Sequence, residues 1–202
     1  HSVAAGHKSM ASMEPATKKA KTEEAPAAAV EETPAIEGDD VVEHSMNINA
    51  AVDKAYEGKN FTELCEAPIS ALQGIAEWTD DLVSGFPRPV PLTIGKLGKW
   101  KYFLWARAIT VLAEKEIEGK REKGISININ KGLDVAHEHK SLKEICALPP
   151  SALQGIAERS DPDFASIRIH TIGDLGKWKF AHWAAAIVSM AELEHVDVSA
   201  HK

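Results

Sequence analysis

The clearest pattern of apolar and polar positions is helical, and it occurs in two long stretches, residues 99–118 and 177–194. Apolar residues recur there every three or four positions, which predicts one long helix in each stretch. The first predicted stripe consists of Trp100, Phe103, Leu104, Ala108, Val111 and Leu112, and the thinner second stripe of Trp178, Ala181, Ala185, Val188 and Ala191. Trp105 and Ile109 widen the first apolar surface, and Trp183 and Ile187 widen the second, which indicates burial on two sides.

Shorter helices are predicted before each long one. Residues 50–57 and 131–138 are expected to form first helices capped by Asn49 and Asn130, with Val52, Ala55 and Tyr56 turned inward. Each is followed by a capping box, in which the cap side chain and a glutamate three residues later satisfy each other's backbone N–H groups. These boxes run from Asn60 to Glu63 and from Ser141 to Glu144.

Proline, threonine and glycine mark the next boundaries. Pro68 and Pro149 are expected to end the second helix and to suit the first turn of a third. The apolar positions of that third helix are Ala71, Leu72, Ile75, Ala152, Leu153 and Ile156. A loop follows, stiffened in one case by Pro87, Pro89 and Pro91, and then a short turn capped by Thr93 or Thr171 and ended by Gly98 or Gly176.

One segment, residues 125–129, alternates Ile with Ser and Asn and could form a strand. Its candidate partner, residues 46–48, is short. We therefore expect both segments to be extended and to pack on the helical units.

The same sequence unit occurs twice. Residues 45–77 align without a gap with residues 126–158, and 19 of the 33 aligned positions are identical. The match resumes at residues 93–100 and 171–178, after three extra residues in the first copy. A fixed internal period predicts two similar folded units in tandem. We call residues 45–118 the first half and residues 126–196 the second half, with residues 119–125 as the linker.

Residues 1–44 are rich in Ala, Glu, Pro, Thr and Lys and nearly lack large apolar side chains, which predicts a disordered tail. Lys18, Lys19 and Lys21 follow Pro15 and resemble a nuclear import signal, although a solvated run of charges is the alternative. Because the chain begins with His1, Met10 or Met13 is a candidate initiator, and a removed transit peptide is the other interpretation.

Composition narrows the classes of function. The formal net charge is −7, which disfavours nucleic acid unless basic residues cluster, and no apolar run reaches the length of a membrane span. Cys65 and Cys146 occupy matching positions and are expected to be buried thiols on equivalent helices. His137 and His139 are two residues apart and would face different sides of a helix, so we expect no metal site.

The segment Leu148–Ala157, followed by residues 169–175, resembles a helix-hairpin-helix domain and is similar to the C-terminal domain of bacterial RNA polymerase α subunits. In that family the backbone N–H groups of a hairpin hold a DNA phosphate. The resemblance places this hairpin at Gly74, Ile75, Gly155 and Ile156. The chain departs from the pattern at Ala76 and Ala157, and Glu77 and Glu158 follow, where a carboxylate opposes phosphate by about 1–4 kcal/mol.

Further surfaces are candidates for contact with a partner. The pairs Lys99–Trp100 and Lys177–Trp178, together with Lys101 and Lys179, could form a basic-aromatic patch for single-stranded nucleic acid. The alternative is a core tryptophan with lysines on the wet face of the helix. The exposed edge of the two long helices is a candidate protein contact, with Lys101, Trp105, Lys179 and Trp183. The prolines at 87, 89 and 91, present in the first half alone, are a candidate protein contact.

The sequence therefore predicts an all-α protein made of two tandem four- to five-helix, helix-hairpin-helix-like units behind a disordered tail. No Ser-His-Asp set, nucleotide loop or Cys-His pair can be assembled, so we expect no enzyme and no cofactor. The leading hypothesis is an intracellular, non-catalytic scaffold or linker subunit with protein partners in a larger complex. The alternatives are a nuclear nucleic-acid-binding protein and a small-ligand or pigment-associated accessory subunit.

Overall fold

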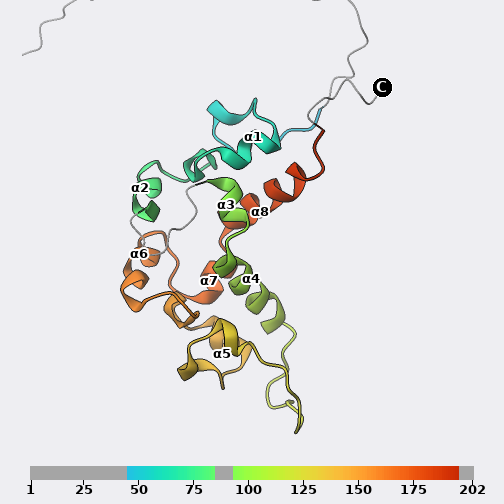
Figure 1. The fold of residues 1–202 in the computed structure, drawn as a ribbon, viewed down its shortest axis with the longest axis vertical. Coiled ribbons are helices and arrows are strands. Elements are labelled where there is room, and N and C mark those ends of the chain that lie inside the picture. The colour runs from blue at the N-terminus through green and yellow to red at the C-terminus, as the bar shows by residue number, and fades with distance from the viewer. Residues whose placement is uncertain (1–44, 85–92, 196–202) are drawn as a thin grey trace, which may run out of the picture. The chain divides into compact units, whose positions relative to one another are not determined.

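The computed structural model describes residues 45–84 and 93–195, which all belong to one compact unit, Val42–Lys202. The described residues form helices and no β-strand, which confirms the all-α prediction (Figure 1). In this part of the chain no helix has both the length and the apolar character to cross a membrane. The predicted tail with Lys18, Lys19 and Lys21, and the predicted contacts Pro87, Pro89 and Pro91, lie outside the described residues.

Four α-helices are described in each half, with short 3₁₀ turns between them. The first half contains α1 (Phe61–Glu66), α2 (Trp78–Ser84), α3 (Ile94–Gly98) and α4 (Lys101–Ala113), with η1 (Lys54–Tyr56) and η2 (Ile69–Ala71). The second half contains α5 (Leu142–Cys146), α6 (Asp161–Ser166), α7 (Ile172–Gly176) and α8 (Lys179–Ala191), with η3 (Asn130–Gly132), η4 (Val135–His137), η5 (Pro150–Ala152) and η6 (Glu158–Ser160).

The capping boxes and the limits of the short helices α3 and α7 are confirmed. Both capping boxes form: the Glu63 N–H donates to Asn60 at 2.7 Å, and the Asn60 N–H donates to the Glu63 carboxylate at 3.1 Å. Ser141 and Glu144 repeat the arrangement at the start of α5. The short helices α3 and α7 begin after their threonine caps and end at glycine, as predicted. The predicted third helices are wrong, because only the 3₁₀ turns η2 and η5 follow Pro68 and Pro149, and Leu72 and Leu153 are extended and form β-bridges.

The predicted first helices are wrong. The 3₁₀ turns η1, η3 and η4 replace them, and Ala55 is exposed. The cause is a tertiary pairing that holds the chain extended, because Val52 forms a β-bridge with Leu72 and Leu133 forms one with Leu153. Backbone hydrogen bonds to the distant hairpin take the place of helical ones. The Asp53 N–H donates to the Ala71 carbonyl and the Gln73 N–H to the Ala51 carbonyl, both at 2.9 Å.

Helices α2 and α6 occupy segments that were predicted as loops. A carboxylate near the start of each helix ties it back to the preceding 3₁₀ turn. The Ser70 N–H donates to Asp80 at 3.2 Å, and the Ser151 N–H donates to Asp161 at 3.0 Å. Acidic residues suit the first turn of a helix, so these aspartates could have marked both helices in the sequence.

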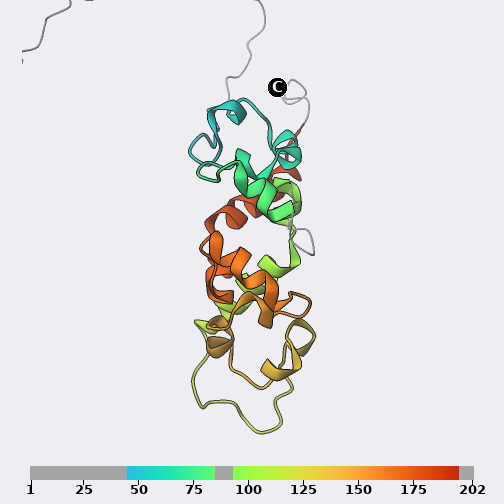
Figure 2. The same cartoon turned by 90° about the vertical axis from the view of Figure 1, so that its left-hand side faces the viewer.

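The last helix of each half packs against the other half. Helix α8 lies on α3 and α1 of the first half, and α4 lies on α7 and α5 of the second half (Figures 1 and 2). The two halves therefore exchange their last helices, and neither half has a complete core without the other.

Two hydrophobic cores result from this exchange. In the first core, Ala181, Ala184 and Ile187 of α8 pack with residues of the first half: Val52, Leu64, Ala67, Ile69, Ala71, Leu72, Ile75, Ile94, Leu97 and Phe103. In the second core, Tyr102, Ala106 and Ile109 of α4 pack with residues of the second half: Leu133, Ile145, Ala152, Leu153, Phe164, Ile169, Ile172 and Leu175. Ala106 and Ile109 align with Ala184 and Ile187, so the two helices present equivalent faces.

The buried face of α4 differs from the predicted stripe. Its buried residues are Tyr102, Phe103, Ala106, Ile109, Thr110 and Ala113, whereas Leu104, Ala108, Val111 and Leu112 are exposed. The buried side carries small residues because α7 approaches it closely: a Cβ atom on Gly176 would lie 2.5 Å from the Ala106 carbonyl oxygen. Close approach of the backbones, rather than the largest side chains, sets the orientation of this helix.

Trp100 and Trp178 precede the long helices instead of lying on their stripes. Each is the N-terminal cap residue, partly buried, and packs against both cores. Trp100 stacks on Phe164 with a centroid distance of 6.2 Å and an interplanar angle of 17°. The two indoles therefore fill the junction where the chain passes from one core to the other.

The extended segments at the start of each half pack less than expected. Ile127 is 76% exposed and Met46 is 77% exposed, although Ile48 does pack on the first core. In the linker, the Arg121 guanidinium donates to the carbonyls of Ile125 and Ile127, both at 2.9 Å. The final helix of the first half ends at Ala113 and does not continue into this segment.

Candidate interaction surface

The predicted hairpin glycines meet the long helix of the other half. Gly74 and Gly155 have φ angles of 95° and 99°, a region that favours glycine. A Cβ atom on Gly155 would lie 2.8 Å from the Tyr102 hydroxyl, and one on Gly74 would lie 3.7 Å from the Phe180 ring. Tyr102 and Phe180 occupy equivalent positions of α4 and α8, so both glycines are covered in the same way. Of the adjacent hairpin residues, Ile75 is buried and Ile156 is partly buried.

The candidate contact residues Lys101, Trp105, Lys179 and Trp183 lie beside these glycines. The Lys101 ammonium is 4.6 Å from the Tyr102 ring centroid and 5.1 Å from that of Trp105. The Lys179 ammonium is 4.7 Å from the Phe180 centroid and 5.0 Å from that of Trp183. Such distances permit cation–π attraction. Trp105 and Trp183 are partly buried, and both lysines are exposed.

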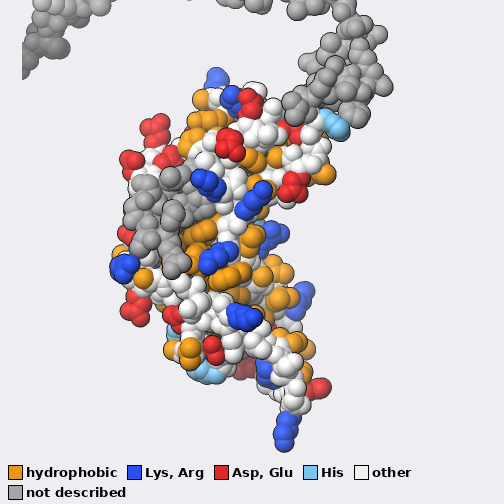
Figure 3. Space-filling view, viewed as in Figure 1, with side chains coloured by type: hydrophobic (Ala, Val, Ile, Leu, Met, Phe, Trp, Pro, Cys, Tyr) orange, Lys and Arg blue, Asp and Glu red, His pale blue; other side chains and the backbone are white. Residues whose placement is uncertain are grey.

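The structure thus brings together residues that lie far apart in the sequence. One lysine-aromatic patch consists of Gly155, Lys101, Tyr102 and Trp105, and the other of Gly74, Lys179, Phe180 and Trp183. Each patch combines a glycine from one half with a helix from the other. Figure 3 shows Lys and Arg side chains in a row over the face on which α3 and α4 lie.

A second surface, which the sequence pattern assigned to the core, is the apolar stripe of α4. It consists of Leu104, Ala108, Val111 and Leu112, at positions i, i+4, i+7 and i+8 of the helix. Leu104 is 40% exposed, Val111 is 54% exposed and Leu112 is 56% exposed. Because the opposite side of α4 is buried in the second core, this helix is apolar on both sides, and the large side chains of its outer stripe are about half exposed.

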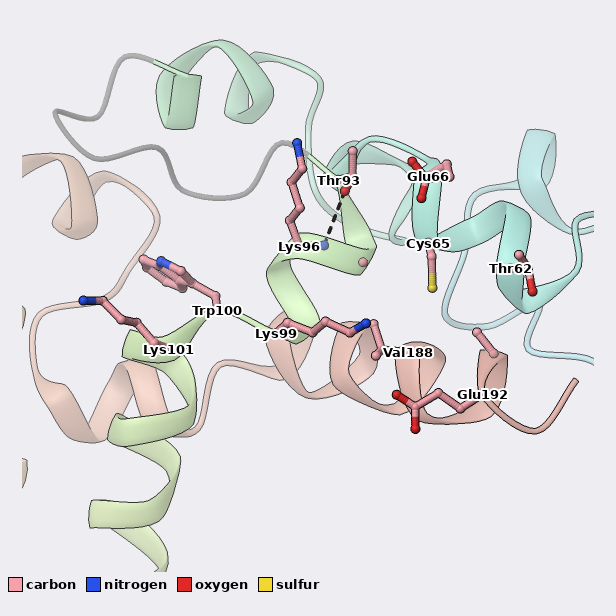
Figure 4. Close-up of a pocket in the computed structure, with 12 residues that line it drawn as sticks. Thr62, Cys65, Glu66, Thr93, Lys96, Lys99, Trp100, Lys101, Val188 and Glu192 are labelled. Atoms are coloured by element: carbon pink, nitrogen blue, oxygen red, sulfur yellow. Dashed lines mark hydrogen bonds between the residues drawn. The ribbon is translucent and has the colours of Figure 1, made fainter.

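A groove lies between α1, α3 and α8, and its lining includes Cys65, Lys96, Lys99 and Glu192. The Cys65 side chain points into it, and Lys99 extends toward α8 (Figure 4). Burial raises the pKa of the Cys65 thiol, and the same cause raises that of Cys146. Both thiols are partly buried rather than fully buried. A raised pKa leaves little thiolate at neutral pH, so the groove offers no activated nucleophile from this residue.

Two glutamates connect the halves by hydrogen bonds at helix starts. The Glu194 carboxylate, after α8, accepts from the N–H groups of Phe61 and Thr62 and from the Thr62 hydroxyl, all at 2.8 Å. The Glu116 carboxylate, after α4, accepts from the N–H groups of Leu142 and Lys143, both at 3.0 Å. With the capping boxes, these bonds satisfy the free N–H groups in the first turns of α1 and α5.

The hydrogen bonds also lower the pKa values of both carboxyl groups. The Lys143 N–H bond is the main cause that lowers the pKa of Glu116, and the Leu142 N–H bond adds to it. Burial alone would raise the pKa of Glu194, but the bonds from Thr62 and Phe61 outweigh it and hold that pKa below its ordinary value of 4.5. Both carboxylates are therefore bound in their charged form.

We expect these glutamates to make the helix exchange sensitive to acid. Their folded-state pKa values lie below the unfolded value, so their stabilisation is complete above about pH 5 and is lost as the pH falls through the lowered values. Replacing both, Glu116→Gln with Glu194→Gln, should cost about 1 kcal/mol per site at pH 7, since both sites are screened by water. Urea unfolding between pH 3 and 7 should show a flatter acid limb for this variant.

Glu114→Gln provides the matched control, since Glu114 is exposed and accepts no corresponding bond across the halves. Its unfolding curve should follow that of the unchanged chain at every pH. An equally steep acid limb in the double glutamine variant would show that the two carboxylates do not couple protonation to folding.

The described residues contain no group of three or more His, Cys, Asp or Glu side chains placed to hold a metal ion. His137 lies in η4, with a buried Nδ1 atom that has no hydrogen-bond partner, and His139 is exposed. The described residues present two lysine-aromatic patches and the apolar stripe of α4 on the surface. No protein-family model, curated protein or solved structure matches this chain.

Proposed function

We propose that this chain is a non-catalytic interaction protein, a scaffold or linker subunit that bridges components of a larger assembly. The observation that carries the proposal is the outer apolar stripe of α4, defined above. Exposed apolar side chains that form a continuous stripe on a helix are typical of contact sites for proteins. The inner side of the same helix is held in a core, so the stripe is presented on a fixed support.

The partner that fits this stripe is an amphipathic helix with acidic borders. Spacing at i, i+4, i+7 and i+8 provides a seam about as wide as one docked helix. Lys101 and Lys115 lie near its two ends and Arg107 lies along one side, where carboxylates of the partner would be attracted. Glu114 lies on the side of Arg107 and would orient the partner by repulsion.

We also propose that the chain arose by tandem duplication of one helix-hairpin-helix-like unit. Supporting this, 19 of 33 aligned residues are identical, and hydrogen bonds recur at equivalent positions. For example, the Ile94 N–H donates to the Ala67 carbonyl at 2.9 Å and the Ile172 N–H to the Leu148 carbonyl at 2.8 Å. Two related units would offer two related surfaces, and tethered sites raise avidity without new contacts.

Nucleic-acid binding is the second candidate, and the two lysine-aromatic patches favour it. Each patch places a lysine and aromatic rings beside the glycine that the resemblance to helix-hairpin-helix domains assigns to the phosphate-binding hairpin. Of the net charge of −7, residues 1–44 carry −5 (4 Lys against 9 acids) and residues 45–202 carry −2 (19 basic residues against 21 acidic). The acidity that disfavours phosphate is therefore concentrated outside the segment that bears the patches.

The two candidates can be separated with defined probes. We expect the full chain to bind a labelled helical peptide with Leu at heptad positions a and d and Glu at e and g, measured by fluorescence anisotropy. Leu112→Lys should weaken binding at least about tenfold, because the lysine replaces the most exposed large apolar side chain of the stripe, which is 56% exposed. A peptide with the same residues in scrambled order should bind poorly.

Met190→Lys is the matched control, because Met190 is the equivalent position on α8 and is 41% exposed. It should leave peptide affinity unchanged. Absence of peptide binding, or equal losses from both substitutions, would contradict the proposed role of α4. Tight binding of a single-stranded oligonucleotide that falls steeply with added salt, and that needs Lys101 and Lys179, would establish the second candidate instead.

A further inference from the structure

We propose that a second copy of this chain can act as its partner through the helix exchange itself, with the first half of one copy paired to the second half of the other. The contacts between the halves come mainly from α4 and α8, from Trp100 and Trp178 that precede them, and from the glutamates that follow them. None of these contacts requires the two halves to belong to the same chain, which is the condition for domain swapping.

The segment that joins the halves contributes little to the cores. Between the end of α4 and the start of η3, Ile117 is 70% exposed, Ile125 is 41% exposed and Ile127 is 76% exposed. A connection with so few packed side chains mainly raises the effective concentration of one half near the other. The recognition between the halves therefore lies in the helices and not in the linker.

An open chain would expose both incomplete cores. The first half alone would uncover the site of Ala184 and Ile187, both of which are buried against it, and the second half alone would uncover the site of Ala106 and Ile109. Exposure of this much apolar surface is unfavourable, so a chain that opens must close again, on itself or on a second copy. Local concentration decides between the two.

A first half should also pair with a second half rather than with another first half. Phe103 of α4 and Ala181 of α8 align with each other, and both are completely buried in the first core. Two first halves would bring two phenylalanines to this place, and two second halves would bring two alanines and leave a cavity. A second copy would therefore contribute its opposite half, as the intramolecular arrangement does.

The test uses the full chain with a protease site inserted after Gly119 in the exposed linker. Cutting the folded protein should leave the two fragments in one complex of unchanged size by light scattering. A cut ¹⁵N-labelled sample and a cut unlabelled sample are then unfolded together in urea and refolded by dilution. Native mass spectrometry should find fragments of both origins mixed at random, and every complex should contain one N-terminal and one C-terminal fragment.

Uncut chains that carry two different tags, refolded together at high concentration, should in addition form dimers. The fraction of chains in dimers should fall when refolding takes place at low concentration. Separation of the fragments on cutting, failure to regain helical circular dichroism after joint refolding, or complexes of two like fragments would overturn the proposal. Phe103→Ala together with Ala181→Phe keeps one large and one small residue at the crossing and should preserve the pairing of unlike fragments.

Discussion

Gly176→Ala is expected to destabilise the protein by about 3 kcal/mol or more. The added Cβ atom would lie 2.5 Å from the Ala106 carbonyl oxygen and would also overlap the Thr110 hydroxyl. Because the carbonyl belongs to the backbone of α4, no side-chain rotation can relieve the contact, and α7 and α4 must move apart. Urea unfolding followed by circular dichroism should show a lower midpoint with little change in slope.

Gly98→Ala tests the equivalent crossing in the first core, where the Cβ atom would lie 2.5 Å from the Ala184 carbonyl oxygen. We expect a loss of similar size, since α3 contacts α8 as α7 contacts α4. Gly58→Ala is the control: no atom lies within 4 Å of its Cβ position, and the change should stay within about 0.5 kcal/mol. If all three substitutions cost equally little, the helices do not cross as closely as described.

Signals that depend on neighbouring residues in the chain predicted the structure well. The capping boxes at Asn60 and Ser141, and the Thr–Gly limits of α3 and α7, depend on hydrogen bonds within one turn. The helix predicted for residues 50–57 does not form, because a contact with a distant part of the chain decides the structure of these residues. Their propensity favours a helix, but the β-bridge from Val52 to Leu72 uses backbone groups that a helix would need.

The exchange of the last helices could not be read from periodicity, because α4 would satisfy its pattern equally well on either half. One sequence signal was available. Ala106, Thr110 and Ala113 place small side chains along one side of α4, and glycine ends α7, which together indicate a close crossing. The pattern of large residues instead favoured the side with Leu104, Val111 and Leu112, which the structure leaves exposed.

For the candidate surfaces, too, the sequence identified residues but not which of them lie together. The sequence identified Lys101, Trp105, Lys179 and Trp183 and, through a resemblance, the two hairpin glycines. It did not indicate that Lys101 belongs with Gly155 and Lys179 with Gly74, since each pair joins different halves. Glu116 and Glu194 cap helices of the opposite half, which the sequence did not indicate.

Phe103→Ala is expected to cost about 3–5 kcal/mol of folding stability. The ring is completely buried in the first core and meets the His182 ring edge to face, with a centroid distance of 5.0 Å and an interplanar angle of 85°. Truncation would therefore leave a cavity and remove an aromatic contact worth about 1 kcal/mol. Denaturant unfolding measures the loss, and Leu104→Ala, at a neighbouring exposed position, should cost less than about 1 kcal/mol.

The expected loss of stability is large because Phe103 lies where the exchanged helices α4 and α8 meet. Ala181 takes the equivalent position on α8 and is buried in the same core, so we expect one large and one small residue to share the space between the halves. Ala181→Phe alone should overpack it and cost about 1–3 kcal/mol. Combined with Phe103→Ala, it should recover part of both losses, with a coupling of about 0.5–3 kcal/mol in a double-mutant cycle. Strict additivity would mean that the two positions do not share one space, and that the choice between like and unlike halves is made elsewhere along α4 and α8.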